Sequence, residues 1–124
     1  MPRLRILIVE DDERTGVGLA ELLEEEGYAV RVANRFEDGI NILRAEPPDL
    51  LIADIRLGSF NGLQLVLRGR PSVPAIVITG YDDPVLAENA RALGATYFVK
   101  PIVPDILLSA IVRAIGAAED VHPT

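Results

Sequence analysis

Five short runs of apolar, largely β-branched residues recur along the chain, separated by segments in which apolar residues return every three or four positions. The runs cover about residues 4–9, 28–33, 50–53, 75–79 and 96–99. They are nearly continuous in apolar residues, which is typical of strands covered on both faces. The periodic segments that follow them predict helices near 14–26, 36–45, 62–69, 84–94 and 104–118. Strand–helix alternation of this kind predicts an α/β fold with a parallel sheet and right-handed crossovers.

Helix boundaries are marked by residues with fixed local roles. Gly27 is placed to end the first helix, and Gly94 to end the fourth. Asp82 and Asp83 precede Pro84, so they are candidate caps for a helix that begins with proline. The third helical segment is the shortest of the five.

Length and composition predict one soluble domain. With 124 residues, the chain can bury roughly two-thirds of its unfolded surface in a single core. We assign residues 1–118 to this domain and 119–124 to a flexible tail, where the sole histidine, His122, is expected to be solvated. There is no cysteine, no leader-like start and no apolar run of the ~20 residues that a membrane span needs. We therefore expect a cytoplasmic protein without a membrane partner.

The charge balance bears on partners. The formal net charge is −7, and the lysines and arginines are scattered along the chain. Phosphate contacts require clustered cations, so direct nucleic-acid binding is not expected.

Polar residues stand where the predicted strands end. Glu10 and Asp11 follow the first strand, Asp54 the third, Thr79 ends the fourth, and Lys100 follows the fifth. The carboxyl ends of parallel strands share one edge of a sheet, where ligands bind. The pattern thus predicts a crevice with carboxylates, a hydroxyl and an ammonium, which suits a divalent cation and a phosphoryl group.

These residues resemble a known family in their joint order and strand-end placement. The matching elements are Ile6-Leu7-Ile8-Val9-Glu10-Asp11-Asp12, Asp54, Gly62, Thr79-Gly80 and Tyr97-Phe98-Val99-Lys100-Pro101. Over essentially its whole length the chain resembles the receiver domain of bacterial two-component response regulators. The resemblance implies a doubly wound five-stranded parallel sheet of order 2-1-3-4-5, with five helices on both faces and the third short or irregular.

The resemblance also implies a metal-dependent phosphoacceptor. Asp54 corresponds to the aspartate that takes the phosphoryl group. Asp11 and Asp54 would bind Mg²⁺ (or Mn²⁺) directly, Glu10 would act through water, and Arg56 would offer its backbone carbonyl. Oxygen ligands of this kind suit Mg²⁺. Asp12 is interpreted as a solvated or helix-capping carboxylate.

Further residues acquire roles from the same resemblance. Lys100 would pair with Asp54 and then with the phosphoryl oxygens, and a cis bond to Pro101 would turn it into the site. Thr79 and Tyr97 would form the switch.

Three residues are interpreted as tuning the site. Gly80 would leave space beside the phosphoryl group. Arg56 and Tyr81 would border the path of attacking water, with a direction of effect that the sequence leaves open.

Some positions depart from the family. Gly58 replaces a usual proline, and glycine is expected to loosen the backbone there. The interval from Gly62 to Pro74 is short, which predicts a stunted third helix. In the fifth helix, Leu108, Val112 and Ile115 are either exposed for a partner or a second copy, or buried against the fourth helix.

The leading interpretation is a phosphorylation-dependent switch, which is not an enzyme beyond its own phosphoryl transfer and dephosphorylation. Its partners would be a histidine kinase or phosphotransfer protein and a downstream protein target. A second copy, bound through the fourth and fifth helices, is a further candidate partner. The alternative is a receiver-like interaction module that works without phosphorylation, or a regulatory domain excised from a longer protein. An aspartyl phosphatase is disfavoured because Arg56 stands where a second catalytic acid is usual.

Overall fold

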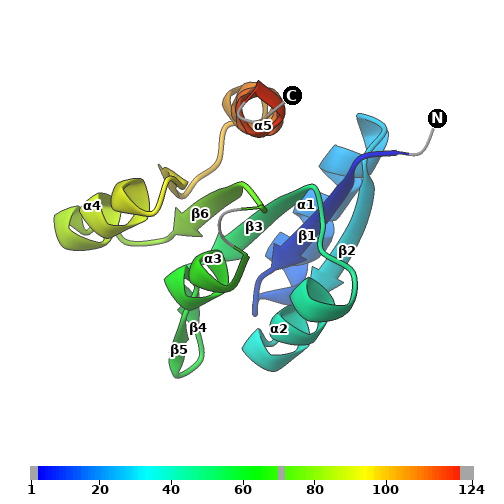
Figure 1. Cartoon of the computed structure of the whole chain (residues 1–124). Coiled ribbons are helices and arrows are strands. Elements are labelled where there is room, and N and C mark those ends of the chain that lie inside the picture. The colour runs from blue at the N-terminus through cyan, green and yellow to red at the C-terminus, as the bar shows by residue number, and fades with distance from the viewer. Residues whose placement is uncertain (1–2, 70–71, 121–124) are drawn as a thin grey trace.

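A five-stranded parallel sheet forms the centre of the domain (Figure 1). The computed structural model describes residues 3–69 and 72–120. The strands lie in the order β2-β1-β3-β6-β7, which counted along the sheet's own strands is the predicted order 2-1-3-4-5. Their bounds are β1 Arg5–Val9, β2 Ala29–Ala33, β3 Leu50–Asp54, β6 Ala75–Thr79 and β7 Thr96–Val99. The predicted fold class is therefore confirmed.

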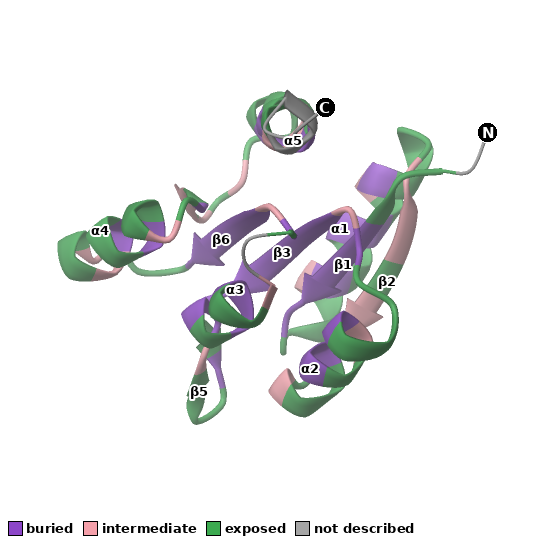
Figure 2. Cartoon of the chain, viewed as in Figure 1, coloured by how far each residue is buried: buried purple, intermediate pink, exposed green. Residues whose placement is uncertain are grey.

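Helices cover both faces of the sheet. They are α1 Glu13–Glu25, α2 Phe36–Ala45, α3 Leu63–Gly69, α4 Pro84–Ala92 and α5 Pro104–Asp120. One apolar cluster joins α2, α3 and α4 to alternate strand residues, and a second joins α1 and α5 to the intervening ones. Strands buried on both sides appear as the purple centre of Figure 2, beneath helices whose outer faces are exposed. Two-sided burial explains why the central strands β1, β3 and β6 are almost purely apolar, whereas the edge strands β2 and β7 are only partly buried.

Most predicted helix ends are confirmed. Asp12 is the N-cap of α1 and accepts a hydrogen bond from the Thr15 N–H at 3.1 Å. Asp83 caps α4 in the same way, and Gly27 follows α1 with a φ of 94°. One boundary is wrong: α5 continues to Asp120, so residues 119 and 120 are helical rather than tail. His122 lies outside the described residues, and within them no helix is long and apolar enough to cross a membrane.

A small antiparallel hairpin follows β3 and was not predicted. It consists of β4 Arg56–Leu57 and β5 Phe60–Asn61, joined by the two residues Gly58 and Ser59. Gly58 has a φ of 62°, whereas Ser59, like every non-glycine residue that the structure describes, does not have a positive φ. This combination indicates a type II′ turn with glycine at its first central position. The expected loosening by Gly58 is thus replaced by a specific turn role.

The third helix is short, as predicted. It has seven residues and begins behind Asn61, whose Oδ1 accepts the Leu63 N–H at 2.8 Å. The Gln64 side chain in turn accepts the Asn61 N–H at 3.0 Å. This reciprocal pair acts like a capping box, except that Asn61 bonds the N–H two residues on rather than three, so the hairpin ends directly in an ordered helix start.

An aromatic stack fixes the hairpin against α2. The rings of Phe36 and Phe60 lie 4.3 Å apart with an interplanar angle of 6°. We expect F36A and F60A to be non-additive in urea unfolding, with a coupling of about 0.5–1.5 kcal/mol, because each variant alone abolishes the stack. The control is F36A with V112A, which alters an exposed residue on α5 and should be additive. Additivity of the Phe36 and Phe60 changes would contradict the stack.

Candidate functional site

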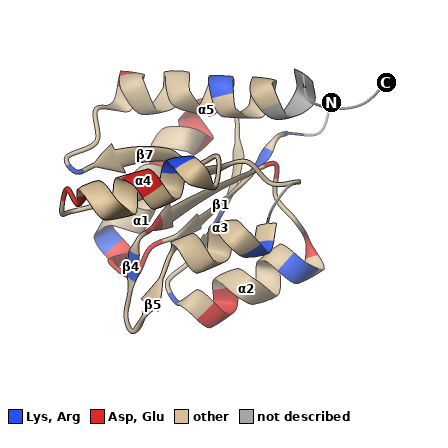
Figure 3. Cartoon of the chain, turned by 60° about the vertical axis from the view of Figure 1, so that its left-hand side comes forward, with Lys and Arg blue, Asp and Glu red and all other residues tan. Residues whose placement is uncertain are grey.

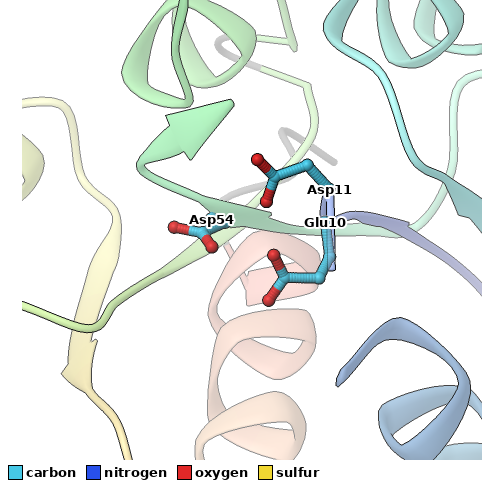
Figure 4. A group of neighbouring side chains, drawn as sticks. All are labelled: Glu10, Asp11 and Asp54. Atoms are coloured by element: carbon cyan, nitrogen blue, oxygen red, sulfur yellow. The ribbon is translucent and has the colours of Figure 1, made fainter. Parts of the chain in front are cut away.

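Three strand ends bring the predicted charged residues to one edge of the sheet. Glu10 and Asp11 follow β1, Asp54 ends β3, and Lys100 follows β7. Val9 in β1 pairs with Ala53 in the adjacent parallel strand β3, so the segments that follow these two strands lie side by side. Figure 4 shows the carboxylates of Glu10, Asp11 and Asp54 directed toward a shared space.

Lys100 is the cation of this cluster. Its Nζ lies 2.9 Å from Glu10 Oε1 and 3.2 Å from Asp54 Oδ2, and the bond to Pro101 is cis. Glu10 is 3% exposed and Asp54 9%, so both ion pairs are shielded from water. Shielding from water strengthens the attraction between Lys100 and the two carboxylates, but each ion also loses hydration energy.

Burial perturbs the two ends of the ion pair differently. Desolvation, followed by the hydrogen bond and charge of Asp54, raises the pKa of Glu10 from 4.5 to about 7 despite the opposing effect of Lys100. Burial alone would lower the pKa of Lys100, but its hydrogen bond to Glu10 and the Asp54 and Glu10 charges raise it above 10.5. The two carboxylates therefore more than offset the cost of burying the Lys100 ammonium, whereas Lys100 does not offset the cost of burying the Glu10 carboxylate. The site holds more negative charge than its own cation neutralises.

The carboxylates fit a hard divalent cation. One oxygen from each of Glu10, Asp11 and Asp54 lies within 4.8 Å of the others. When all three carboxylates are ionised, one lysine leaves an excess of two negative charges, which a dication would balance. An all-oxygen donor set that is open to water at exposed Asp11 matches the preference of Mg²⁺ or Mn²⁺.

The Thr79 hydroxyl lies at the same sheet edge but is bonded away from Asp54. Its Oγ1 accepts the Tyr81 N–H and donates to the Tyr81 carbonyl, both at 3.1 Å. The Tyr97 hydroxyl accepts the Asp83 N–H at 3.1 Å and lies 3.5 Å from the Tyr81 carbonyl. It also lies 3.4 Å from Asp82 Oδ1, so the Tyr81 carbonyl is one of two weak acceptors near its single hydrogen.

Four supporting interactions were missed from the sequence. The Asn34 side chain donates to the Glu10 carbonyl at 3.0 Å and holds the acidic loop, a role signalled only by its position after β2. Arg56 donates its N–H to Asp54 Oδ1 at 3.0 Å, and its guanidinium carbon lies 4.9 Å from the centre of the Tyr81 ring. Gly62 lies against Asp54 so closely that a Cβ would be 2.1 Å from the Asp54 carbonyl oxygen.

The α4–β7–α5 side of the domain exposes several aliphatic side chains. They are Val85, Val99, Val103, Ile106 and Val112. Of the three α5 residues in question, Val112 is 63% exposed, Leu108 is partly buried and Ile115 is buried. The charged residues in Figure 3 are distributed over several elements, in keeping with the scattered lysines and arginines of the sequence.

Comparison with known proteins decides the family. A family model described as the response regulator receiver domain matches residues 6–112. The chain belongs to this family. The receiver domain is a module of two-component signalling.

Individual relatives agree with this assignment. The receiver domain is 37% identical to the acid tolerance regulatory protein ActR of Sinorhizobium medicae and 32% identical to the transcriptional regulatory protein PdtaR of Mycobacterium tuberculosis. Each match covers 98% of this chain, but only 64% and 60% of the respective relative. A solved receiver domain protein (CheY-like) from Methanospirillum hungatei is 30% identical with a TM-score of 0.90, covering 98% of this chain and all of that one.

Proposed function

We propose that this receiver domain is a switch that accepts a phosphoryl group on Asp54 from a phosphohistidine of a histidine kinase or phosphotransfer protein. The observation that carries the proposal is the surrounding of Asp54. Its carboxylate lies 3.2 Å from the half-buried ammonium of Lys100. One of its oxygens lies within 4.8 Å of an oxygen from each of two further carboxylates. A nucleophile, a cation and a set of metal ligands thus meet at one carboxylate.

The cluster would hold Mg²⁺ or Mn²⁺ next to the nucleophile. Asp11 and Asp54 would be direct ligands, Glu10 would act through water, and the Arg56 carbonyl would complete the protein set. When bound, the ion offsets repulsion between the Asp54 carboxylate and the incoming phosphoryl oxygens. Asn34 and the Arg56 N–H keep the acidic loop and Asp54 in place for this purpose.

The transfer step needs little from the protein beyond position and charge. An Asp54 carboxylate oxygen forms a bond to phosphorus as the P–N bond of the donor breaks. The electron pair leaves with the imidazole, which takes a proton from solvent. Lys100, already paired with Asp54, follows the new negative charge, as a flexible ammonium can.

The phosphorylated form would differ in Thr79 and Tyr97. The Thr79 hydroxyl would donate to a phosphoryl oxygen, and Tyr97 would change position in response. Because Tyr97 lies in β7 beside α4, this shift would alter the α4–β7–α5 surface with its exposed aliphatic residues. That surface would bind a downstream protein target or a second copy. Such a switch works only if the target makes different contacts with the two forms.

Hydrolysis would reset the switch. A water oxygen attacks phosphorus, the bond to Asp54 breaks, and inorganic phosphate leaves while the carboxylate is restored. Gly80, which has open space where a Cβ would stand, leaves room for the water or the donor. Arg56 and Tyr81 border the path and would tune the lifetime of the phosphoryl group.

The test is incubation of the domain with Mg²⁺ and a small acyl phosphate, followed by intact-mass and peptide mass spectrometry. We expect one added phosphoryl group, located on Asp54 and absent from D54N. The matched control is D49N, which alters the other aspartate flanking β3 and should be phosphorylated like the wild type. Absence of the adduct in the wild type, or its persistence in D54N, would refute the proposal.

A further inference from the structure

A cation–π contact crosses the mouth of the site. The Arg56 guanidinium carbon lies 4.9 Å from the centre of the Tyr81 ring, within the range of an attractive contact. Arg56 stands two residues after Asp54, and Tyr81 stands two residues after Thr79. Both side chains are exposed, Tyr81 by 68%. The contact therefore joins the start of β4 to the loop that follows β6.

The main chain of Tyr81 also holds the hydroxyl of the switch residue Thr79. Its N–H and carbonyl both bond the Thr79 hydroxyl at 3.1 Å. The same carbonyl lies 3.5 Å from the Tyr97 hydroxyl, a weaker contact. The ring of Tyr81 is thus bound to Arg56, and its backbone is bound to Thr79.

These bonds compete with the phosphorylated arrangement. A hydroxyl has a single hydrogen, so Thr79 cannot donate to Tyr81 and to a phosphoryl oxygen at once. Movement of Thr79 onto the phosphoryl group requires it to leave the Tyr81 carbonyl, and the Tyr81 loop is held by the stack on Arg56.

We propose that the Arg56–Tyr81 contact is a latch that holds the Tyr81 loop, and through it Thr79, in the unphosphorylated arrangement. Arg56 and Tyr81 are then positioning residues rather than catalytic ones. This inference rests on the proposed function and states how Arg56 and Tyr81 would act in it: they would favour the unphosphorylated arrangement. A ligand that binds only the released arrangement loses affinity in proportion to the fraction of molecules that are latched.

Removing the ring should therefore strengthen the binding of a phosphoryl analogue. An exposed cation–π contact corresponds to about a two- to five-fold change in equilibrium, so we expect Y81A to bind beryllofluoride about two- to five-fold more tightly. Y81F keeps the ring and should restore the wild-type affinity. Since the Tyr81 side chain is largely exposed, its truncation should leave the fold intact.

The experiment is a beryllofluoride titration of the full chain at saturating Mg²⁺, followed by the amide signal of Gly80 in NMR spectra. Truncating Tyr81 could also open access to the site, which would raise the association and dissociation rates equally and leave the equilibrium affinity unchanged. The equilibrium affinity is therefore the quantity to measure. R56A removes a positive charge as well as the latch, so a double-mutant cycle is required. If the two residues act as a pair, Y81A should tighten binding in the wild type and have no effect in R56A.

The outcomes separate the latch from the proposed function. Equal or weaker binding by Y81A, or the same effect of Y81A with and without Arg56, would overturn the latch while phosphorylation of Asp54 stands. Mg²⁺ affinity should be the same in Y81A and wild type, because no proposed ligand changes. A wild-type domain that neither binds beryllofluoride nor gains a phosphoryl group would overturn both proposals.

Discussion

Replacing Glu10 with Gln is expected to stabilise the metal-free domain at about pH 8 by about 1–3 kcal/mol. Glu10 is 3% exposed and faces Asp54, and its pKa is raised from 4.5 to about 7. The ionised carboxylate is thus costly in the folded protein, and the amide avoids that cost while keeping an acceptor for Lys100. The same change is expected to weaken Mg²⁺ binding by about ten- to a hundred-fold, as losses of supporting groups around a metal do.

The sign of the pH dependence follows from linkage. The folded protein holds the Glu10 proton more tightly than the unfolded chain, whose pKa is near 4.5. The stability due to this proton is therefore complete below about pH 4.5 and is lost as the pH rises to about 7. E10Q has no such proton to lose, so its advantage should grow across that interval and level off above it. Urea unfolding in EDTA, followed by circular dichroism across this range, measures the difference.

Mg²⁺ binding should show the opposite trend in the wild type. A proton on Glu10 competes with the cation, so affinity should fall as the pH drops below about 7, and more steeply than in E10Q. The matched control is E21Q, which removes an exposed carboxylate from α1 and should change neither stability nor Mg²⁺ affinity measurably. A destabilised E10Q, or one with undiminished Mg²⁺ affinity, would contradict the account of Glu10 as a costly residue kept for the metal.

The sheet could be predicted from the sequence because each strand is marked by its own local pattern of apolar residues. Leu50–Asp54 and Ala75–Thr79 are apolar on both faces, and only a sheet covered on both sides buries them. Strand ends are marked by the polar residues themselves, so the meeting of Glu10, Asp54 and Lys100 could be anticipated before any coordinates. Helix caps such as Asp83 are equally local and were predicted for the same reason.

The parts that could not be predicted depend on contacts distant in sequence. The Phe36–Phe60 stack and the Arg56–Tyr81 contact join segments that are distant in sequence, and no local pattern encodes their proximity. Gly58 was misjudged because glycine permits both a flexible loop and a tight turn, and only the partner strand distinguishes them. The position of the Thr79 hydroxyl likewise depends on the path of the following loop. The functional groups of the site could be predicted from the sequence, but the contacts that position them could not.

Gly62→Ala is expected to destabilise the domain by about 2–4 kcal/mol and to displace Asp54. A Cβ at this position would lie 2.1 Å from the Asp54 carbonyl oxygen and 2.9 Å from its carbonyl carbon. Neither neighbour is a flexible side chain that can turn aside. Gly62 also donates its N–H to the Ile55 carbonyl at 2.7 Å, so the backbone cannot move away without losing that bond.

The same chemical change elsewhere supplies the control. Gly18 lies exposed within α1 with nothing within 4 Å of an added Cβ, so G18A should stabilise the domain by about 0.5–1 kcal/mol through helix propensity. Urea unfolding of both variants should therefore give opposite signs. In G62A, displacement of Asp54 should also slow acyl phosphate labelling measured by mass spectrometry, whereas G18A should label at the wild-type rate. If G62A were as stable and as reactive as the wild type, Gly62 would not be the contact that positions the phosphoacceptor.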